Sequence, residues 1–138
     1  MKKDVKTLTV EAKKENLDCV ISFITGFFEE HGCSMKTVMQ AQLCAEEVFV
    51  NIVSYAYGKE GGSVEISLSE NEGSAEIVFA DSGVPYDPIK KEDPDLTLSA
   101  DKRRIGGLGI FLVKKNMDKV SYAYENGKNV LTMLKRIR

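Results

Sequence analysis

The chain has 138 residues, of which 43% are hydrophobic, and a formal net charge of -2 at pH 7, a size and composition that fit one globular domain. This charge gives no general attraction to nucleic acid, and no apolar run approaches the roughly 20 residues of a membrane-spanning helix. The three cysteines are odd in number and widely spaced, which argues against a disulfide framework or a zinc site and favours reduced thiols in a cytoplasm. We therefore expect a single cytoplasmic domain over residues 1–138, without direct contact to nucleic acid or membrane.

The N-terminal part of the chain predicts a strand followed by two helices. Residues 5–10 alternate between apolar and polar side chains, which is typical of a half-buried strand. Over residues 13–31, apolar side chains recur every three or four positions, and Gly32 then provides a helix stop. A second helix is predicted over 34–57, where the first residue is a capping serine. The only histidine, His31, falls at the end of the first helix, so we expect a polar helix-terminal residue there rather than a catalytic one.

Two hairpins follow. Residues 63–69 and 74–80 alternate apolar and polar side chains on either side of a glycine-containing turn. Residues 119–124 and 129–137 are predicted to form the second hairpin, around a turn with the sequence Glu-Asn-Gly. Clustered hairpins favour a mixed, mostly antiparallel sheet with the helices on one face, which is a two-layer α/β sandwich of the α+β class.

A long irregular segment separates the two hairpins. Residues 82–105 have no periodicity and hold all three prolines, and a helical pattern returns only at 108–116. A loop longer than about 15 residues is uncommon inside a compact domain, and such loops are often lids or binding loops. We therefore predict a lid over approximately residues 86–105.

The second predicted helix carries a carboxylate and a carboxamide that share a face. Glu47 and Asn51 are four residues apart, so their side chains stack one turn from each other. Asn51 could bind a hydrated Mg²⁺, which prefers oxygen ligands, and Glu47 could activate a nucleophile. A solvated polar helix face would explain the same two residues. Glu46 doubles the acid, so the choice of Glu47 depends on its spacing from Asn51.

An aspartate comes directly after the apolar strand that ends the first hairpin. A partly buried Asp81 carboxylate is costly unless it meets a donor, and the exocyclic amine of adenine is such a donor. Gly83 would let the backbone approach a flat ring closely. Ordinary turn chemistry, with Asp-Ser-Gly followed by Val-Pro, is the alternative explanation.

A glycine cluster opens the third predicted helix. Gly106, Gly107 and Gly109 would leave the amides at a helix N-terminus open, and such amides bind phosphate. The pattern is not a P-loop, and a flexible hinge would also account for it. The cations at 102–104 could be brought over a triphosphate by a closing lid, although a solvated charge run is their default explanation.

Together, the three segments predict metal, adenine and phosphate subsites in one chain. They resemble the ATPase superfamily shared by DNA gyrase, histidine kinases, a heat-shock chaperone and mismatch-repair ATPases. Residues 47–51 look like its N-box, 81–88 like its first glycine box, 106–113 like its second, and 129–133 like its final strand. Within that superfamily, the closest likeness, strongest over residues 40–138, is to bacterial anti-sigma factors that are serine/threonine kinases of the RsbW type.

The resemblance implies the Bergerat ATP-binding fold with ATP and Mg²⁺ as ligands. It implies that Asn51 ligates Mg²⁺ and that Glu47 is the general base. It also implies that Asp81 binds the adenine amine, that Thr132 supports Asp81, and that Gly83 flanks the ring.

The phosphate subsite follows from the same resemblance. It implies that Gly107, Leu108 and Gly109 hold the phosphates beneath the lid, which carries Arg104.

The resemblance further implies a function. The chain would be an ATP-dependent protein serine/threonine kinase that acts as an anti-sigma factor and phosphorylates a small anti-sigma-factor antagonist in a partner-switching system. A sigma factor would compete for the same surface, commonly on a homodimer. The alternative is a non-catalytic or weakly catalytic ATP-binding module that sequesters a protein partner. Glu47 favours the kinase, because a pure binding module has no need of a base beside Asn51.

Overall fold

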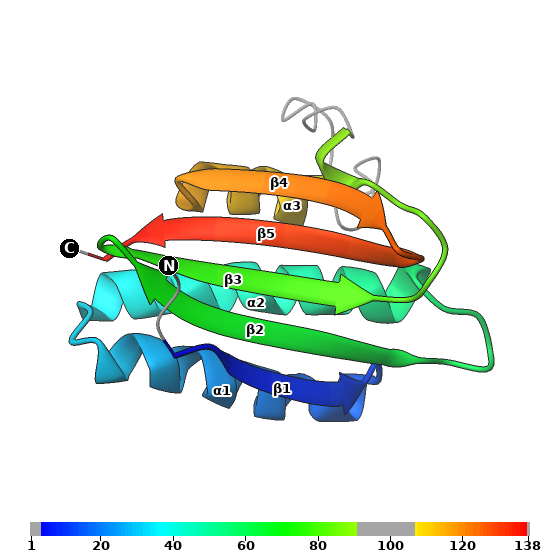
Figure 1. Ribbon diagram of the computed structural model, residues 1–138, viewed down its shortest axis with the longest axis horizontal. Coiled ribbons are helices and arrows are strands. Elements are labelled where there is room, and N and C mark those ends of the chain that lie inside the picture. Colours follow the sequence, from blue (N-terminus) through cyan, green and yellow to red (C-terminus); the bar gives the residue numbers. More distant parts are fainter. Residues whose placement is uncertain (1–3, 91–106, 138) are drawn as a thin grey trace.

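The computed structural model describes residues 4–90 and 107–137, which form a five-stranded sheet with three α-helices packed on one face (Figure 1). The remainder of the predicted lid, residues 91–105, lies outside the described residues. In chain order the elements are β1 (Lys6–Glu11), the 3-10 turn η1 (Lys14–Asn16), α1 (Leu17–Glu30), α2 (Met35–Tyr55), β2 (Ser63–Asn71), β3 (Ser74–Asp81), the 3-10 turn η2 (Pro88–Lys90), α3 (Gly107–Asn116), β4 (Lys119–Glu125) and β5 (Lys128–Arg136).

The sheet has the strand order β1-β2-β3-β5-β4, and each neighbouring pair of described strands is antiparallel. The prediction of a mostly antiparallel sheet is confirmed, and the described strands contain no parallel pair. Both hairpins turn through two residues with positive φ, the geometry of a type I′ turn that Asn-Gly and related pairs favour. These are Glu72 (53°) with Gly73 (84°), and Asn126 (55°) with Gly127 (76°).

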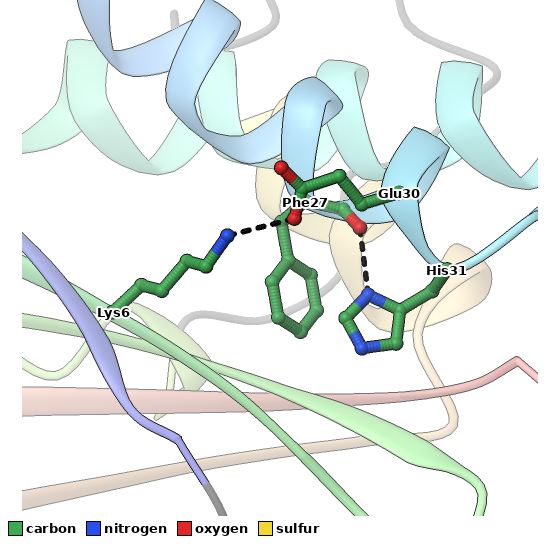
Figure 2. Close-up of polar contacts among 4 residues, drawn as sticks. All are labelled: Lys6, Phe27, Glu30 and His31. Atoms are coloured by element: carbon green, nitrogen blue, oxygen red, sulfur yellow. Dashed lines mark hydrogen bonds and ion pairs between the residues drawn. The ribbon is translucent and has the colours of Figure 1, made fainter.

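The ends of the helices follow the predicted signals. The Ser34 side chain accepts a hydrogen bond from the Thr37 backbone N–H at 3.2 Å and so caps α2. Gly32, at φ 70°, ends α1 in the left-handed conformation. His31 is confirmed as a helix-terminal residue: its Nδ1 donates to the Phe27 carbonyl oxygen at 2.8 Å (Figure 2).

An ion pair joins the edge of the sheet to the first helix. Lys6 of β1 donates to a Glu30 carboxylate oxygen of α1 at 2.7 Å (Figure 2), and this hydrogen bond lowers the pKa of Glu30. Both side chains are well exposed, so the pair contributes little to stability. Within residues 4–90 and 107–137, no helix combines the length and the apolar character that crossing a membrane requires.

The core lies between the sheet and the helices. Phe28 of α1, Phe49 of α2 and Phe79 of β3 are among its largest fully buried side chains. Along β3 the side chains alternate strictly, and every second one is buried against the helices. The last buried position of this strand is Asp81, so the alternation of the strand places the carboxylate of Asp81 in the protein interior.

Candidate functional site

A cavity lies where the C-terminal half of α2 meets the ends of β3 and β5. It holds about 450 Å³ of empty space, counted out to its open mouth. A mostly apolar lining with a few polar groups is typical of a small-molecule site. The lining residues are Val48, Asn51, Ile52, Tyr55, Ala56, Phe79, Asp81, Val84, Tyr86, Pro88, Ile110, Tyr122, Asn129 and Leu131.

Asp81 provides the carboxylate of this cavity, and its side chain is only 5% exposed. Its Oδ1 accepts hydrogen bonds from the Gly83 backbone N–H at 2.9 Å and from the Asn129 Nδ2 at 3.0 Å. Within the described residues, Oδ2 has no hydrogen-bond partner, yet no fully buried polar side-chain atom there is left unpaired. Oδ2 is therefore open to the cavity, where a ligand donor can reach it.

Asn129 is the functional residue that the sequence analysis missed. It faces Asp81 directly in the β3–β5 register and is 6% exposed. The signal was available in the sequence: Leu131 and Met133 are apolar core positions of β5, so Asn129 occupies the same face of the strand with a polar side chain.

The position of Thr132 does not support the role expected for it. Thr132 lies between the buried residues Leu131 and Met133, so it points to the opposite face of the sheet from Asp81. Its register partner is Val78, three positions away from Asp81 along β3. The protein donor to Asp81 on β5 is therefore not Thr132 but the residue three positions before it.

Gly83 has a structural reason to be glycine. A Cβ at this position would lie 2.1 Å from the Ala56 carbonyl oxygen at the end of α2. The same carbonyl accepts a hydrogen bond from the Val84 backbone N–H at 2.9 Å. The close approach seen here is thus to a helix end, and Gly83 is not among the residues that line the cavity.

A tyrosine hydroxyl fastens the same loop from the other side. The Tyr57 hydroxyl donates to the Ser63 carbonyl oxygen at 2.6 Å and accepts from the Ser82 backbone N–H at 2.7 Å. This link joins the start of β2 to the segment that follows β3. The loop carrying the rim of the cavity is therefore anchored both to α2 and to the sheet.

Asn51 faces the cavity with its carbonyl oxygen available. Its side chain is 8% exposed, and its Nδ2 donates to the Glu47 backbone carbonyl at 3.0 Å. Because a carbonyl can only accept, the amide orientation is fixed, and Oδ1 has no hydrogen-bond partner among the described residues. Asp81 and Asn51 are thus brought together in one cavity, as the sequence predicted.

Glu47 lies beside this cavity rather than in it. Its side chain lines a neighbouring groove between α2 and α3, together with Glu46 and Leu112. Partial burial raises the pKa of Glu47, and the charge of Glu46 raises it further. Glu46 is exposed, so Glu47 is the only one of the two acids that the protein partly buries.

The predicted phosphate-binding residues fall in two classes. Gly107, Leu108 and Gly109 form the first turn of α3, and Ile110 of that turn lines the cavity. The N-terminus of this helix is therefore next to the cavity. Arg104 lies outside the described residues.

A metal ion would find few protein ligands here. Among the described residues there is no cluster of three or more histidine, cysteine, aspartate or glutamate side chains. The free amide oxygen of Asn51 nevertheless suits Mg²⁺, which keeps several waters and often shares its coordination with phosphate oxygens. The site fits a metal that arrives with a phosphorylated ligand better than one held by protein alone.

Similar proteins identify the family to which this chain belongs. The model of the histidine kinase-like ATPase domain family matches residues 10–135. A serine-protein kinase RsbW from Halalkalibacterium halodurans is 31% identical over 137 residues, covering 93% of this chain and 80% of the relative. The chain is an RsbW-type member of the histidine kinase-like ATPase domain family. The predicted family is confirmed.

Two other relatives of this ATPase-family chain are also named as protein kinases. Serine-protein kinase RsbW from Listeria monocytogenes is 29% identical over 133 residues, covering 93% of this chain and 85% of the relative. Serine/threonine-protein kinase BtrW from Bordetella bronchiseptica is 34% identical over 92 residues, or 66% of this chain and 65% of the relative.

A solved structure supports the fold of this ATPase-family chain. The crystal structure of the RsbU and RsbW domains of Rv1364c from Mycobacterium tuberculosis superposes with a TM-score of 0.66 at 14% identity. The match covers 98% of this chain, which spans about a third of the other, 33% of its length. The predicted α+β sandwich is thereby confirmed.

Proposed function

We propose that this chain is an ATP-dependent protein serine/threonine kinase that acts as an anti-sigma factor and phosphorylates a small anti-sigma-factor antagonist. One observation carries the proposal. The open Oδ2 of Asp81 and the free Oδ1 of Asn51 lie in one largely apolar cavity, in a chain whose relatives are named serine-protein kinases.

The adenine end of the proposed site is built from apolar walls and one acceptor. Ile52, Phe79 and Leu131 would cover the faces of a purine and exclude water from it. The open oxygen of Asp81 would accept a hydrogen bond from the exocyclic amine of adenine. Guanine carries a carbonyl oxygen at that ring position, which would face a carboxylate with no proton between them. The arrangement therefore favours ATP over GTP.

The phosphate end of the proposed site lies toward α3. Asn51 would hold Mg²⁺ through its amide oxygen together with phosphate oxygens and water. When bound, the ion neutralises charge on the phosphates during transfer. The backbone amides of Gly107–Gly109 would donate to the phosphates at a helix N-terminus, and we assign Arg104 to the same subsite.

Glu47 is proposed to act on the phosphoacceptor. Its carboxylate would take the proton of the serine or threonine hydroxyl as that oxygen bonds to the γ-phosphorus, and the bond to the ADP oxygen breaks. Burial raises the pKa of Glu47, which makes it a better proton acceptor than an exposed carboxylate. Because Glu47 lines the groove between α2 and α3, the protein substrate would approach from that side.

The proposed partners follow from the proposed activity. The antagonist is the substrate, a sigma factor is the sequestered protein, and the kinase works as a cytoplasmic homodimer. Direct contact with nucleic acid or membrane forms no part of this proposal.

A second candidate is an ATP-binding regulatory module with little or no kinase activity. The observation that favours it is the position of Glu47, which lines a groove next to the cavity that holds Asn51 and Asp81. In such a module, nucleotide would stabilise the partner-binding state without transfer.

Phosphate transfer from radiolabelled Mg-ATP to the cognate antagonist distinguishes the two candidates. We expect Glu47→Gln to reduce transfer about a hundredfold or more while ATP binding is kept, because a general base contributes roughly 10² to 10⁴. Glu46→Gln is the matched control and should transfer normally. Persistent transfer by Glu47→Gln would remove this residue from the role of base. ATP binding without transfer by the wild-type protein would favour the regulatory module.

A further inference from the structure

We propose that the outer face of α2 is the docking surface for the protein substrate, and that it accepts an apolar patch bordered by carboxylates. The surface is a row of exposed apolar side chains that leads to the groove of Glu47. This row, the α2 ladder, consists of Met35, Met39, Leu43 and Val50. The inference rests on the proposed kinase function and assigns the surface that recognises the substrate.

The α2 ladder is a straight stripe because of the spacing of its members. Met35, Met39 and Leu43 are four residues apart, and Val50 follows two turns later. At about 100° per residue, the four side chains fall within an arc of roughly 80° and extend over about 22 Å of the helix axis. Val48, on the opposite side of the helix, is buried in the core. The stripe therefore lies on the outer face of α2, the middle helix of the layer (Figure 1).

The exposure of these side chains points to a protein partner. Met35 and Met39 are 75% and 60% exposed, and Leu43 and Val50 are 44% and 36% exposed. A single exposed apolar residue is ordinary, whereas a contiguous row of them marks an interaction surface. Methionine is enriched in such surfaces, since its flexible and polarisable side chain adapts to a partner. Polar residues such as glutamine would form an equally good helix, so helix formation does not account for the row.

The C-terminal part of the α2 ladder belongs to the groove that holds Glu47. Leu43 and Val50 line this groove together with Glu47 itself. A protein that covers the ladder therefore extends without interruption to the carboxylate that is proposed to take the proton of the phosphoacceptor hydroxyl. A second copy of this chain on the ladder would cover the same groove and keep the substrate away from Glu47. The substrate is thus the occupant that agrees with the proposed function.

Two exposed cations border the N-terminal half of the α2 ladder. Lys36 directly follows Met35, and Lys115 is in the last turn of α3. The two helices meet here, because the Gln40 Nε2 donates to the Asn116 Oδ1 at 3.2 Å. Cations beside an apolar row favour a partner that carries carboxylates at the facing positions. We therefore infer that the substrate presents an apolar patch with acidic residues at its border.

Oxidation of methionine tests this surface in the wild-type protein. Dilute peroxide should convert Met35 and Met39 to sulfoxides well before Met117 and Met133, which are buried, as measured by mass spectrometry. The protein is then mixed with Mg²⁺, a non-hydrolysable ATP analogue and the antagonist that it phosphorylates. At ten times its Kd, the antagonist should slow oxidation of Met35 and Met39 about tenfold, because only about one chain in eleven stays free. Oxidation of these two residues that slows as this chain alone is concentrated would show that a second copy covers the ladder, and would overturn the assignment.

The double variant Met35→Gln/Met39→Gln removes the apolar surface without adding a charge. Glutamine and methionine are both good helix formers, so α2 should be kept. We expect the KM for the antagonist to rise by roughly five- to thirtyfold. The kcat and the KM for Mg-ATP should not change, because docking contacts are made equally in the ground state and the transition state. Val5→Gln, at an exposed apolar residue away from α2, is the matched control and should behave as the wild type.

Reversal of a bordering charge tests the acidic character of the partner. Lys36→Glu should raise the KM for the antagonist by roughly threefold or more, and the effect should shrink as salt is added. Lys59→Glu, which reverses an exposed charge in the segment after α2, should leave this KM unchanged. A lower KM in Lys36→Glu would overturn the inference that the partner carries carboxylates there.

The outcomes separate the docking surface from the proposed function. Wild-type protein that transfers phosphate to no antagonist would contradict the proposed function and the docking surface together. If the wild type does transfer phosphate, the docking surface alone would be overturned by either of two results. One is equal oxidation of Met35 and Met39 with and without the antagonist, and the other is an unchanged KM for the antagonist in the folded double variant.

Discussion

Replacing Asp81 by asparagine changes one ligand-facing atom and little else. In Asp81→Asn, the amide oxygen would take the place of Oδ1, because the Gly83 N–H and the Asn129 Nδ2 both need an acceptor there. The new NH₂ group then occupies the place of Oδ2, at the open side of the cavity. A donor now faces the exocyclic amine of adenine, where the wild-type protein has an acceptor.

The size of the effect follows from this exchange. A hydrogen bond to a charged group contributes about 1.5–3 kcal/mol, and about 1.4 kcal/mol corresponds to a tenfold change in Kd. We therefore expect Asp81→Asn to weaken Mg-ATP binding by roughly 10- to 150-fold, as measured by calorimetry. Both hydrogen bonds within the protein are kept, so thermal unfolding without nucleotide should change little. Binding of Mg-GTP should be less affected, since the amide can donate to the guanine carbonyl. ATP affinity within about threefold of the wild type, in a folded variant, would refute the placement of adenine at Asp81.

Three further predictions concern backbone packing, the back of the sheet and pH. Gly83→Ala should lower the free energy of unfolding by about 1–3 kcal/mol, because its Cβ would lie 2.1 Å from the Ala56 carbonyl oxygen. Gly58→Ala is the control and should not lower it, because the space around Gly58 is open. Equal melting temperatures of the two variants would contradict this prediction. Thr132→Val should leave ATP affinity unchanged, and a loss beyond about fivefold would restore its predicted role at Asp81. The rate of transfer should rise with pH through the pKa of Glu47, which burial lifts above the ordinary 4.5. In Glu46→Gln the same rise is expected at lower pH, because the charge of Glu46 also raises this pKa. A profile without the rise would contradict the assignment of Glu47 as the base. Since the folded state then binds this proton more tightly than the unfolded state, wild-type stability relative to Glu47→Gln should decline over the same rise in pH.

The fold was largely predictable because its signals are local. Each hairpin turn contains a glycine with positive φ, Ser34 caps α2, and Gly32 ends α1 at the expected place. The largest boundary error is at the first helix: α1 begins at Leu17, not at residue 13. Residues 14–16 form a 3-10 turn instead, and Asn16 Nδ2 donates back to the Glu11 carbonyl at 2.8 Å. A side chain bonded to the preceding strand competes with helix formation, and periodicity does not reveal this.

A residue of the candidate site was predictable only where the sequence pattern of a single helix or strand points to it. The helix spacing gave Asn51, and the end of an apolar strand gave Asp81. The pairing of Asp81 with Asn129 joins residues 48 positions apart and depends on the β3–β5 register, which neither strand specifies by itself. The expected role of Thr132 came from the resemblance of its strand to the family's final strand, whereas in the structure Asn129 is on the face of β5 that meets Asp81 and Thr132 is on the other face.

The most direct test of the nucleotide site is a crystal structure of the protein with Mg²⁺ and a non-hydrolysable ATP analogue. We predict that the exocyclic amine of adenine lies about 2.9 Å from the Asp81 Oδ2. The Asn51 Oδ1 should then point to the metal and the phosphates. A nucleotide bound outside this cavity, or one whose amine faces away from Asp81, would contradict the account.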